Sequence, residues 1–69
     1  MGIKGTISKM VPCDVDGNTH YYIKLVGQDE IFDIILADHI ELINYEVGSQ
    51  IEFEYTNGGD CYIIQNIVS

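Results

Sequence analysis

Arginine and tryptophan are absent from this chain of 69 residues, and lysine occurs only three times. Aspartate and glutamate together occur eleven times, so the formal net charge is −8 at pH 7. A surface with so few cations offers no evident patch for phosphate groups, and it would repel duplex nucleic acid over most of its area. The charge balance therefore favours a positively charged protein as a partner, while the simplest alternative is an acidic surface that only keeps the protein soluble.

Cysteine and long apolar runs are also scarce. The two cysteines, Cys13 and Cys61, lie far apart, and two thiols without a secretory signal do not make a disulfide framework. Both are expected to be buried structural residues. No apolar run approaches the ~20 residues of a membrane helix, and no charged-then-apolar segment opens the chain. We therefore expect a cytoplasmic location and no membrane as a partner.

What the sequence does contain is strand-like alternation. It is clearest where Ile51, Phe53 and Tyr55 are separated by Glu52 and Glu54. Successive side chains of a strand point to opposite faces, so the three apolar side chains are expected to face a core and the two glutamates water. Other segments rich in Ile, Val and Tyr predict four more strands, at residues 3–11, 19–26, 30–36 and 61–68.

The connections between these strands carry turn signals. Pro12 is expected to end the first strand, because proline cannot donate to a central ladder. The loop at 12–18 and the Asn-Gly-Gly-Asp run at 57–60 are typical of turns. In the third strand, either Asp33 faces water and Phe32 points inward, or a bulge switches faces midway.

The segment 37–45 differs from its neighbours, because Asp38 can cap a short helix there. Three apolar side chains of this segment are expected to cover one end of the sheet: Ile40, Leu42 and Ile43. Five short strands with a break between the third and fourth predict an all-β fold. The expected architecture is a five-stranded antiparallel barrel of the oligonucleotide/oligosaccharide-binding (OB) type, in a single domain over 1–69.

Four motifs, in this order, resemble those of a cold-shock domain, a small variant of that barrel. Lys4-Gly5-Thr6-Ile7 is similar to the family's opening Lys-Gly-Thr-Val, and Gln65-Asn66-Ile67 to its closing Ala-Asn-Val. Between them, the acidic turn at 27–30 and the strand at 48–54 resemble the family's third-strand turn and its Gly-x-x-Val-x-Phe-Glu strand. The resemblance covers nearly the whole chain. It implies binding of single-stranded nucleic acid by bases that stack on exposed aromatic rings.

The chain departs from the family's pattern on that stacking face. His20 and Tyr22 would occupy the two stacking positions of the first motif, and only Phe32 is retained from the second. Lys9 or Met10 stands where the family has a tryptophan. Because stacking is worth ~1–3 kcal/mol per base, losing about half of the platform predicts much weaker binding.

Residues 31–55 also resemble the small molybdate-binding barrels. Those sites hold an oxyanion with strand-end backbone amides, Ser or Thr hydroxyls and a lysine. No such set can be placed in this sequence, and the acidic surface argues against an oxyanion ligand.

Patterns for catalysis or metal binding are weak. Four residues could together bind a metal: Cys13, Asp14, Asp16 and His20. Their spacing matches no zinc pattern, and the Asp-x-Asp-Gly run is too short for a calcium loop. We find no nucleophile with a base and no phosphate-cradling loop. The sequence therefore predicts a protein that is not an enzyme and that has no cofactor and no metal site.

Three functional hypotheses follow, and the third, a metal or oxyanion binder, rests on the weak patterns described above. The first is a non-catalytic acidic module that binds a basic protein, itself a candidate nucleic-acid-binding protein, for example as a nucleic-acid-mimicking inhibitor of the small phage-encoded, anti-CRISPR type. Its acidic face would consist of Asp29, Glu30, Asp33, Glu52 and Glu54. The alternative is a divergent binder of single-stranded nucleic acid. Its binding residues would be Lys9, His20, Tyr22 and Phe32.

Overall fold

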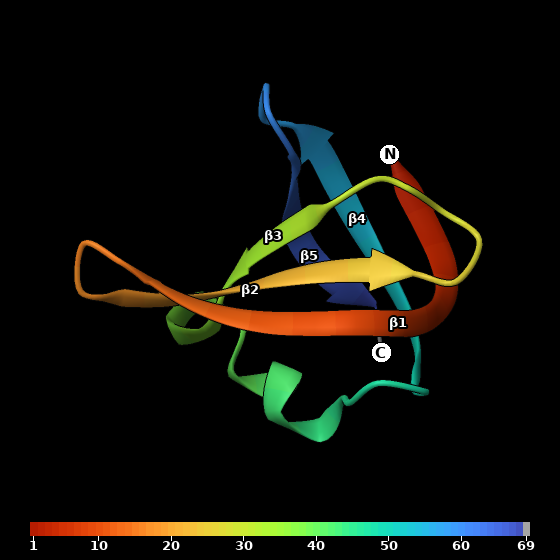
Figure 1. Cartoon of the computed structure of the whole chain (residues 1–69), viewed down its shortest axis with the longest axis horizontal. Helices are drawn as coiled ribbons and strands as arrows, with labels where there is room; N and C mark the ends of the chain where they lie inside the picture. Colours follow the sequence, from red (N-terminus) through yellow and green to blue (C-terminus); the bar gives the residue numbers. More distant parts are fainter. Residues whose placement is uncertain (69) are drawn as a thin grey trace.

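The computed structural model describes residues 1–68, and these form five strands and two short 3-10 helices (Figure 1). The strands are β1 (Gly2–Val15), β2 (Asn18–Leu25), β3 (Phe32–Ile35), β4 (Gln50–Asn57) and β5 (Tyr62–Val68). The helices η1 (Leu36–Asp38) and η2 (Ile40–Asn44) lie between β3 and β4, where a short helix or turn was predicted. The prediction of a mostly β protein is confirmed. Within the described chain, no helix is long and apolar enough to cross a membrane.

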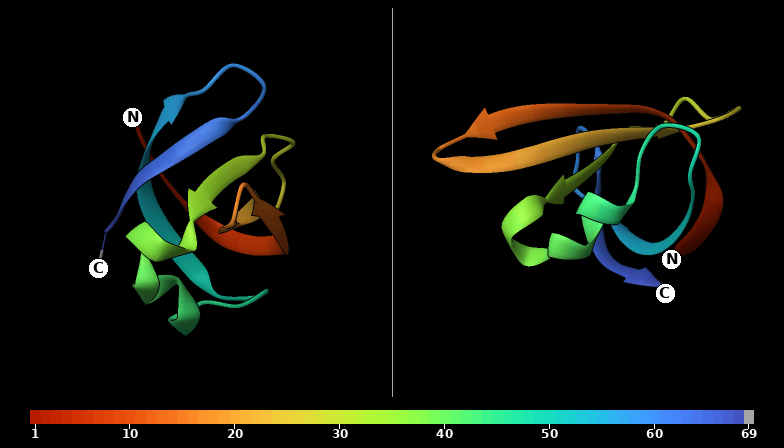
Figure 2. Two further views of the ribbon diagram at one scale, coloured as in Figure 1. Left: turned by 90° about the vertical axis from the view of Figure 1, so that its left-hand side faces the viewer. Right: turned by 90° about the horizontal axis from the view of Figure 1, so that it is seen from below.

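The strands pair in the order β1-β2-β3-β5-β4, and β4 returns to β1, so that the sheet closes in a ring (Figure 2). In residues 1–68, β3 and β5 are the one parallel pair, through Phe32 opposite Tyr62 and Asp33 opposite Ile63. The prediction of an entirely antiparallel sheet was wrong at this contact. Hairpins make neighbouring strands antiparallel, whereas the chain reaches β5 from β3 only after crossing over through η1, η2 and β4.

The core lies inside the ring and receives side chains from every strand and from η2. Its buried members are Ile7, Ile23, Leu25, Phe32, Ile34, Leu42, Ile51, Phe53, Ile64 and Ile67. In β4 the predicted alternation is confirmed, with Ile51 and Phe53 buried and both glutamates exposed. In β3, Phe32 and Ile34 point inward and Asp33 points outward, which is the regular one of the two predicted alternatives.

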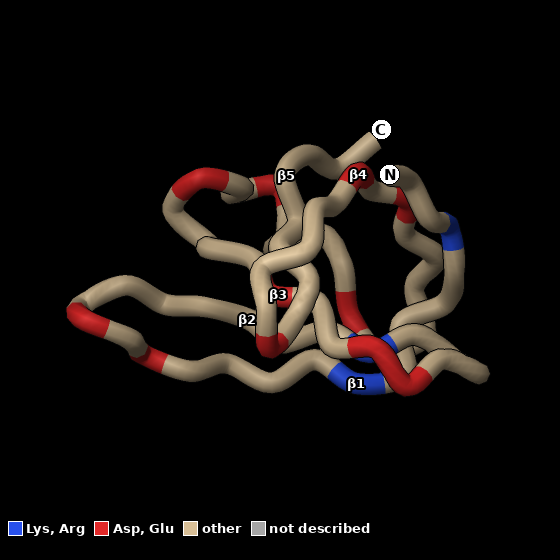
Figure 3. Tube along the Cα trace, turned by 90° about the horizontal axis from the view of Figure 1, so that it is seen from above, with Lys and Arg blue, Asp and Glu red and all other residues tan. Residues whose placement is uncertain are grey.

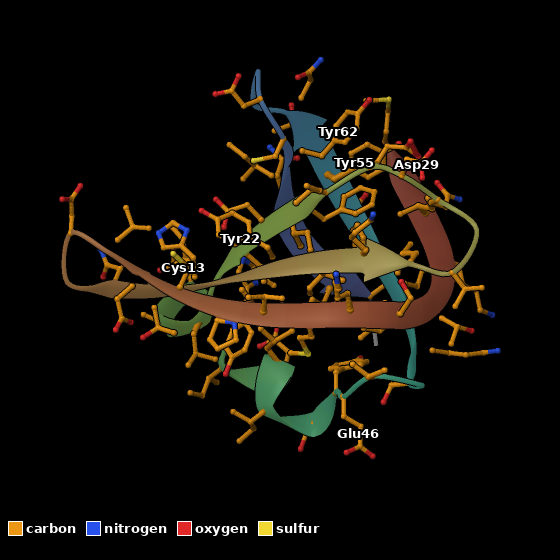
Figure 4. All side chains as sticks on the ribbon, in the orientation of Figure 1. Cys13, Tyr22, Asp29, Glu46, Tyr55 and Tyr62 are labelled. Atoms are coloured by element: carbon orange, nitrogen blue, oxygen red, sulfur yellow. The ribbon has the colours of Figure 1, made fainter. Side chains whose placement is uncertain are left out.

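Aromatic side chains fill the inside of the closed sheet at the end near the β4–β5 turn. The ring of Phe32 lies 4.9 Å from that of Phe53, 5.2 Å from Tyr55 and 5.6 Å from Tyr62, measured between centroids. Figure 4 shows the two tyrosines at the upper end of the molecule and Glu46 at the opposite end, near the 3-10 helices. These aromatic contacts therefore fill one end of the core, and the helices cover the other.

Strand β1 continues to Val15, although Pro12 was expected to end it. A two-residue turn at Asp16 and Gly17, both with positive φ, joins it to β2 and is typical of a tight hairpin. Such a turn is flanked by a hydrogen-bonded pair, so the alternation along the hairpin places Pro12 opposite Tyr21 in a non-hydrogen-bonded pair. The missing N–H of Pro12 then falls on the free edge of β1, because β4 pairs only with residues 2–6.

The two 3-10 helices correct the prediction for residues 37–45. Asp38 is the last residue of η1 and caps nothing, since η2 begins after His39 without a side-chain cap. Leu42 is buried as predicted, but Ile40 is 64% and Ile43 70% exposed. Residues three apart lie on the same side of a 3-10 helix, so these two isoleucines share one side of η2, and that side faces solvent.

Replacement of Leu42 and of Ile43 by alanine tests this orientation of η2. Leu42→Ala removes a buried side chain and is expected to lower the free energy of unfolding by about 2–5 kcal/mol. Ile43→Ala removes an exposed one and is expected to change it by less than about 0.5 kcal/mol. Urea unfolding followed by circular dichroism measures both values. Similar losses for the two variants would contradict the structure of this segment.

Candidate functional site

The outer surface of β1 and β2 carries a groove with a volume of about 700 Å³. We call it the outer groove. Its lining comes from β1, β2, the β2–β3 loop and the end of the β4–β5 turn: Lys9, Val11, Tyr22, Lys24, Ile31, Asp60 and Cys61. Two lysines and one aromatic ring thus surround a partly apolar floor.

The strand register brings these lysines together. Lys9 lies directly opposite Lys24, and Val11 lies opposite Tyr22. Like charges in directly opposite positions destabilise a strand pair. Among the residues that the structure describes, no lysine nitrogen lies within 4.0 Å of a carboxylate oxygen. The two ammonium groups are therefore available to an external anion.

Negative charge reaches the same groove from β3. Asp33 lies opposite Tyr22 in the sheet, and its Oδ1 is 2.8 Å from Nδ1 of His20, with both side chains half-buried. Loss of hydration raises the pKa of Tyr22, and the negative charge of Asp33 raises it further. Burial likewise raises the pKa of Cys61, with added contributions from Asp33 and Asp60. The outer groove is thus mixed in charge.

The structure separates the four residues of the predicted stacking surface. Lys9 and Tyr22 line the outer groove, and His20 lies beside it, in contact with Asp33. Phe32 is only 1% exposed, so its assignment as a base-stacking residue was wrong. The inward alternation of β3 places that ring in the core. Tyr22 is the aromatic ring that remains in the groove lining.

The five residues of the predicted acidic face do not lie on one surface. Asp29 and Glu30, in the β2–β3 loop, meet Asp60 of the β4–β5 turn around a shallow hollow. Glu52 and Glu54 lie on β4, where Glu52 is opposite Lys4 and Glu54 accepts a 3.4 Å hydrogen bond from Asn66. Asp33 lies on β3 and is outside the lining of that hollow, and Figure 3 shows acidic residues spread over several separate segments. We call Asp29, Glu30 and Asp60 the acidic loop group.

The cysteines and the suggested metal ligands are also separated. Cys13 is exposed, which corrects the expectation of burial, and Cys61 is half-buried; both thiols are free. Cys13, labelled in Figure 4, lies opposite His20 across the hairpin. The ring of His20, however, is hydrogen-bonded to Asp33. Within residues 1–68, no group of three or more His, Cys, Asp or Glu side chains could hold a metal ion.

A second groove, which the sequence did not predict, lies between the β1–β2 hairpin and the 3-10 helices. We call it the apolar groove. Met10 and Tyr21 line it from the hairpin, and Leu36, Leu42 and Ile43 from the helices; Tyr45, Glu46 and Val47 line it from the loop before β4. The one signal in the sequence was the excess of apolar residues in 40–47 over what a single helical stripe can bury.

Comparison of the chain with protein-family models, with curated proteins and with solved structures finds no match. Function is therefore inferred from the ring-closing sheet, the two grooves and the distribution of charge.

The two cysteines are expected to differ in reactivity. At pH 8, iodoacetamide should alkylate Cys13 faster than Cys61, because Cys61 is half-buried and its raised pKa leaves less thiolate. The midpoint of the rise in rate at Cys61 should lie above pH 9.0, the ordinary pKa of a cysteine. Mass spectrometry of the single-cysteine variants Cys13→Ser and Cys61→Ser measures the two rates.

Asp33→Asn tests one cause of the raised pKa of Cys61. It removes a negative charge that raises the pKa of Cys61, so alkylation of Cys61 at pH 8 should become faster. Equal rates for the two cysteines, or an unchanged rate in Asp33→Asn, would contradict the described surroundings of Cys61.

Proposed function

We propose that this protein is a non-catalytic interaction module that binds a basic surface of a partner protein. The observation that carries the proposal is that the carboxylates of the protein are not buried and that most of them have no cationic neighbour. All eleven lie within the described residues and none is buried. Only Asp33 and Glu41 have a basic side chain within 4.0 Å, in each case a histidine. The remaining nine of the eleven have no cationic neighbour at that distance and can pair with a partner's lysines and arginines.

We also infer that the ring-closing sheet is an OB-type barrel of the cold-shock kind. The strand order and the helical segment between β3 and β4 support this inference. OB-type barrels bind their ligands on strands 2 and 3 and on the 1–2 and 4–5 loops. The outer groove lies in this region, but Phe32 is withdrawn from it, and Asp33 and Asp60 add negative charge. That combination disfavours a polyanion and supports a protein ligand.

The form of this function that we propose is a nucleic-acid mimic. Carboxylates held on a rigid sheet and its loops can occupy a basic cleft that would otherwise hold phosphates. Long-range attraction speeds and orients such an encounter. An inhibitor of the phage-encoded, anti-CRISPR type would act in this way. The acidic loop group places three carboxylates around one hollow of the surface.

An arginine–glycine dodecapeptide labelled with a fluorophore is a suitable probe for this function. Binding is expected at low salt and should weaken steadily between about 50 and 500 mM salt. The double variant Asp29→Asn/Glu30→Gln should weaken binding by about two- to thirtyfold, as expected for two surface charge pairs. Fluorescence anisotropy measures the affinity.

The matched control for this experiment is Asp14→Asn/Asp16→Asn, which removes the same charge at the tip of the hairpin. It should leave the affinity nearly unchanged. No binding at low salt, or binding that ignores salt, would overturn the proposed function. Equal losses in both double variants would overturn the role of the acidic loop group.

A second function is favoured by the position of Lys9 opposite Lys24, beside Tyr22. Two ammonium groups next to a ring suit a phosphate and a stacked base of single-stranded nucleic acid. This candidate predicts micromolar binding of oligo-dT or oligo-U. Tyr22→Leu removes the ring and should weaken binding by ~1–3 kcal/mol, whereas Tyr22→Phe keeps the ring and should retain it. Equal affinities in both variants would exclude base stacking on Tyr22.

A further inference from the structure

The apolar groove is a place where the protein surface could hold a large side chain. Its walls are the β1–β2 hairpin and the η1–η2 segment. The right-hand view of Figure 2 shows the long hairpin extending past the two 3-10 helices. Its volume is about 450 Å³, which lies within the range of ligand pockets, about 300–1,000 Å³.

Exposed apolar side chains continue this groove outward. Ile43 and Val47 line it and are 70% and 60% exposed, and Ile40 shares the solvent-facing side of η2 with Ile43. Single exposed apolar residues are ordinary on protein surfaces. Here they adjoin half-buried Met10 and Tyr45 in one lining, and contiguous apolar surface of this kind marks interaction sites.

The charge around the groove indicates what could cover it. Glu46 is part of the lining, and Asp38 and Glu41 lie on the two 3-10 helices that form one wall. Residues 36–49 contain no lysine or arginine, and His39 is 3.6 Å from Glu41. All three lysines of the chain lie on β1 and β2. A complementary occupant therefore carries bulky apolar side chains with lysine or arginine next to them.

A second copy of this chain does not fit that description. In a symmetric dimer the same patch meets itself, so Glu46 of the lining and the two helices that carry Asp38 and Glu41 would meet the same acidic surface of the other copy. Each copy also carries a net charge of −8. Like-charge contact of this kind disfavours association.

We propose that the apolar groove binds the bulky apolar side chain of a basic partner segment, with the surrounding carboxylates pairing with the lysines or arginines beside it. This inference rests on the proposed function, since it assumes a basic protein partner. The acidic loop group lies near the β4–β5 turn, away from this groove, and draws the partner in by charge alone.

Two synthetic dodecapeptides of equal charge separate the apolar contact from the electrostatic one. One is the arginine–glycine repeat, and in the other a leucine and a phenylalanine replace two central glycines. The second peptide is expected to bind at least about tenfold more tightly, because burying even one large apolar side chain gives a gain of that order. Ile43→Ser and Val47→Ser should each remove much of this gain and leave the affinity for the repeat peptide unchanged.

Val26→Ser is the matched control for Val47→Ser, because Val26 is 63% exposed and lies outside the apolar groove. It should leave both affinities unchanged. Nuclear magnetic resonance shift mapping with the second peptide should locate the largest changes in η2 and at residues 45–47.

Each other outcome overturns the inference. Salt-dependent binding of both peptides with equal affinity would leave the proposed function standing and remove the apolar groove as a site. A tenfold gain that persists in Ile43→Ser and Val47→Ser would place the apolar contact elsewhere. Failure of both peptides to bind at low salt would overturn the proposed function itself. A dimer in sedimentation that Ile43→Ser dissociates would make a second copy the occupant.

Discussion

The edge-to-face contact of Phe32 with Phe53, at 4.9 Å and 69°, is the constraint on which the rest of the structure depends. A ring of so few strands has room inside for little more than one layer of side chains. Strand β3 is only four residues long, so it can supply two inward side chains, and these are Phe32 and Ile34. The alternation of the strand then leaves Asp33 no position except the outer surface. The packing of the Phe32 side chain in the core thereby places the Asp33 carboxylate on the outer surface.

That carboxylate shapes the outer groove. Asp33 holds His20 at 2.8 Å, and its charge contributes to the raised pKa values of Tyr22 and Cys61. The same alternation buries the ring of Phe32, so this ring is not on the outer face, where nucleic-acid-binding barrels stack bases. The burial of the Phe32 ring and the outward position of the Asp33 carboxylate thus follow from one alternation. Both features disfavour a polyanion at the position where Lys9 and Lys24 would otherwise favour one.

Features set by neighbouring residues could be predicted from the sequence, and features set by distant ones could not. The alternation of Ile51 and Phe53 with glutamates marks β4 by itself, and the Asp16-Gly17 turn marks the end of the hairpin. The parallel contact of β3 with β5 depends on the whole path of the chain, so no local pattern reveals it. Pro12 was misinterpreted because its effect depends on whether β4 continues alongside β1. The apolar groove was missed because three separate segments build it.

The unpaired carboxylates and the apolar groove have complementary physical consequences for binding. Carboxylates without internal partners break no ion pair when a basic surface approaches. Their full charge therefore raises the association rate and orients the two proteins. Charge of this kind discriminates poorly among basic partners, and salt screens it within about 8 Å at physiological ionic strength. Burial of an apolar side chain is not screened by salt, and it requires a matching shape. If the two proposals hold, charge would attract many basic partners and the apolar groove would retain only those whose side chains fit beside η2, so that a small acidic protein would be selective.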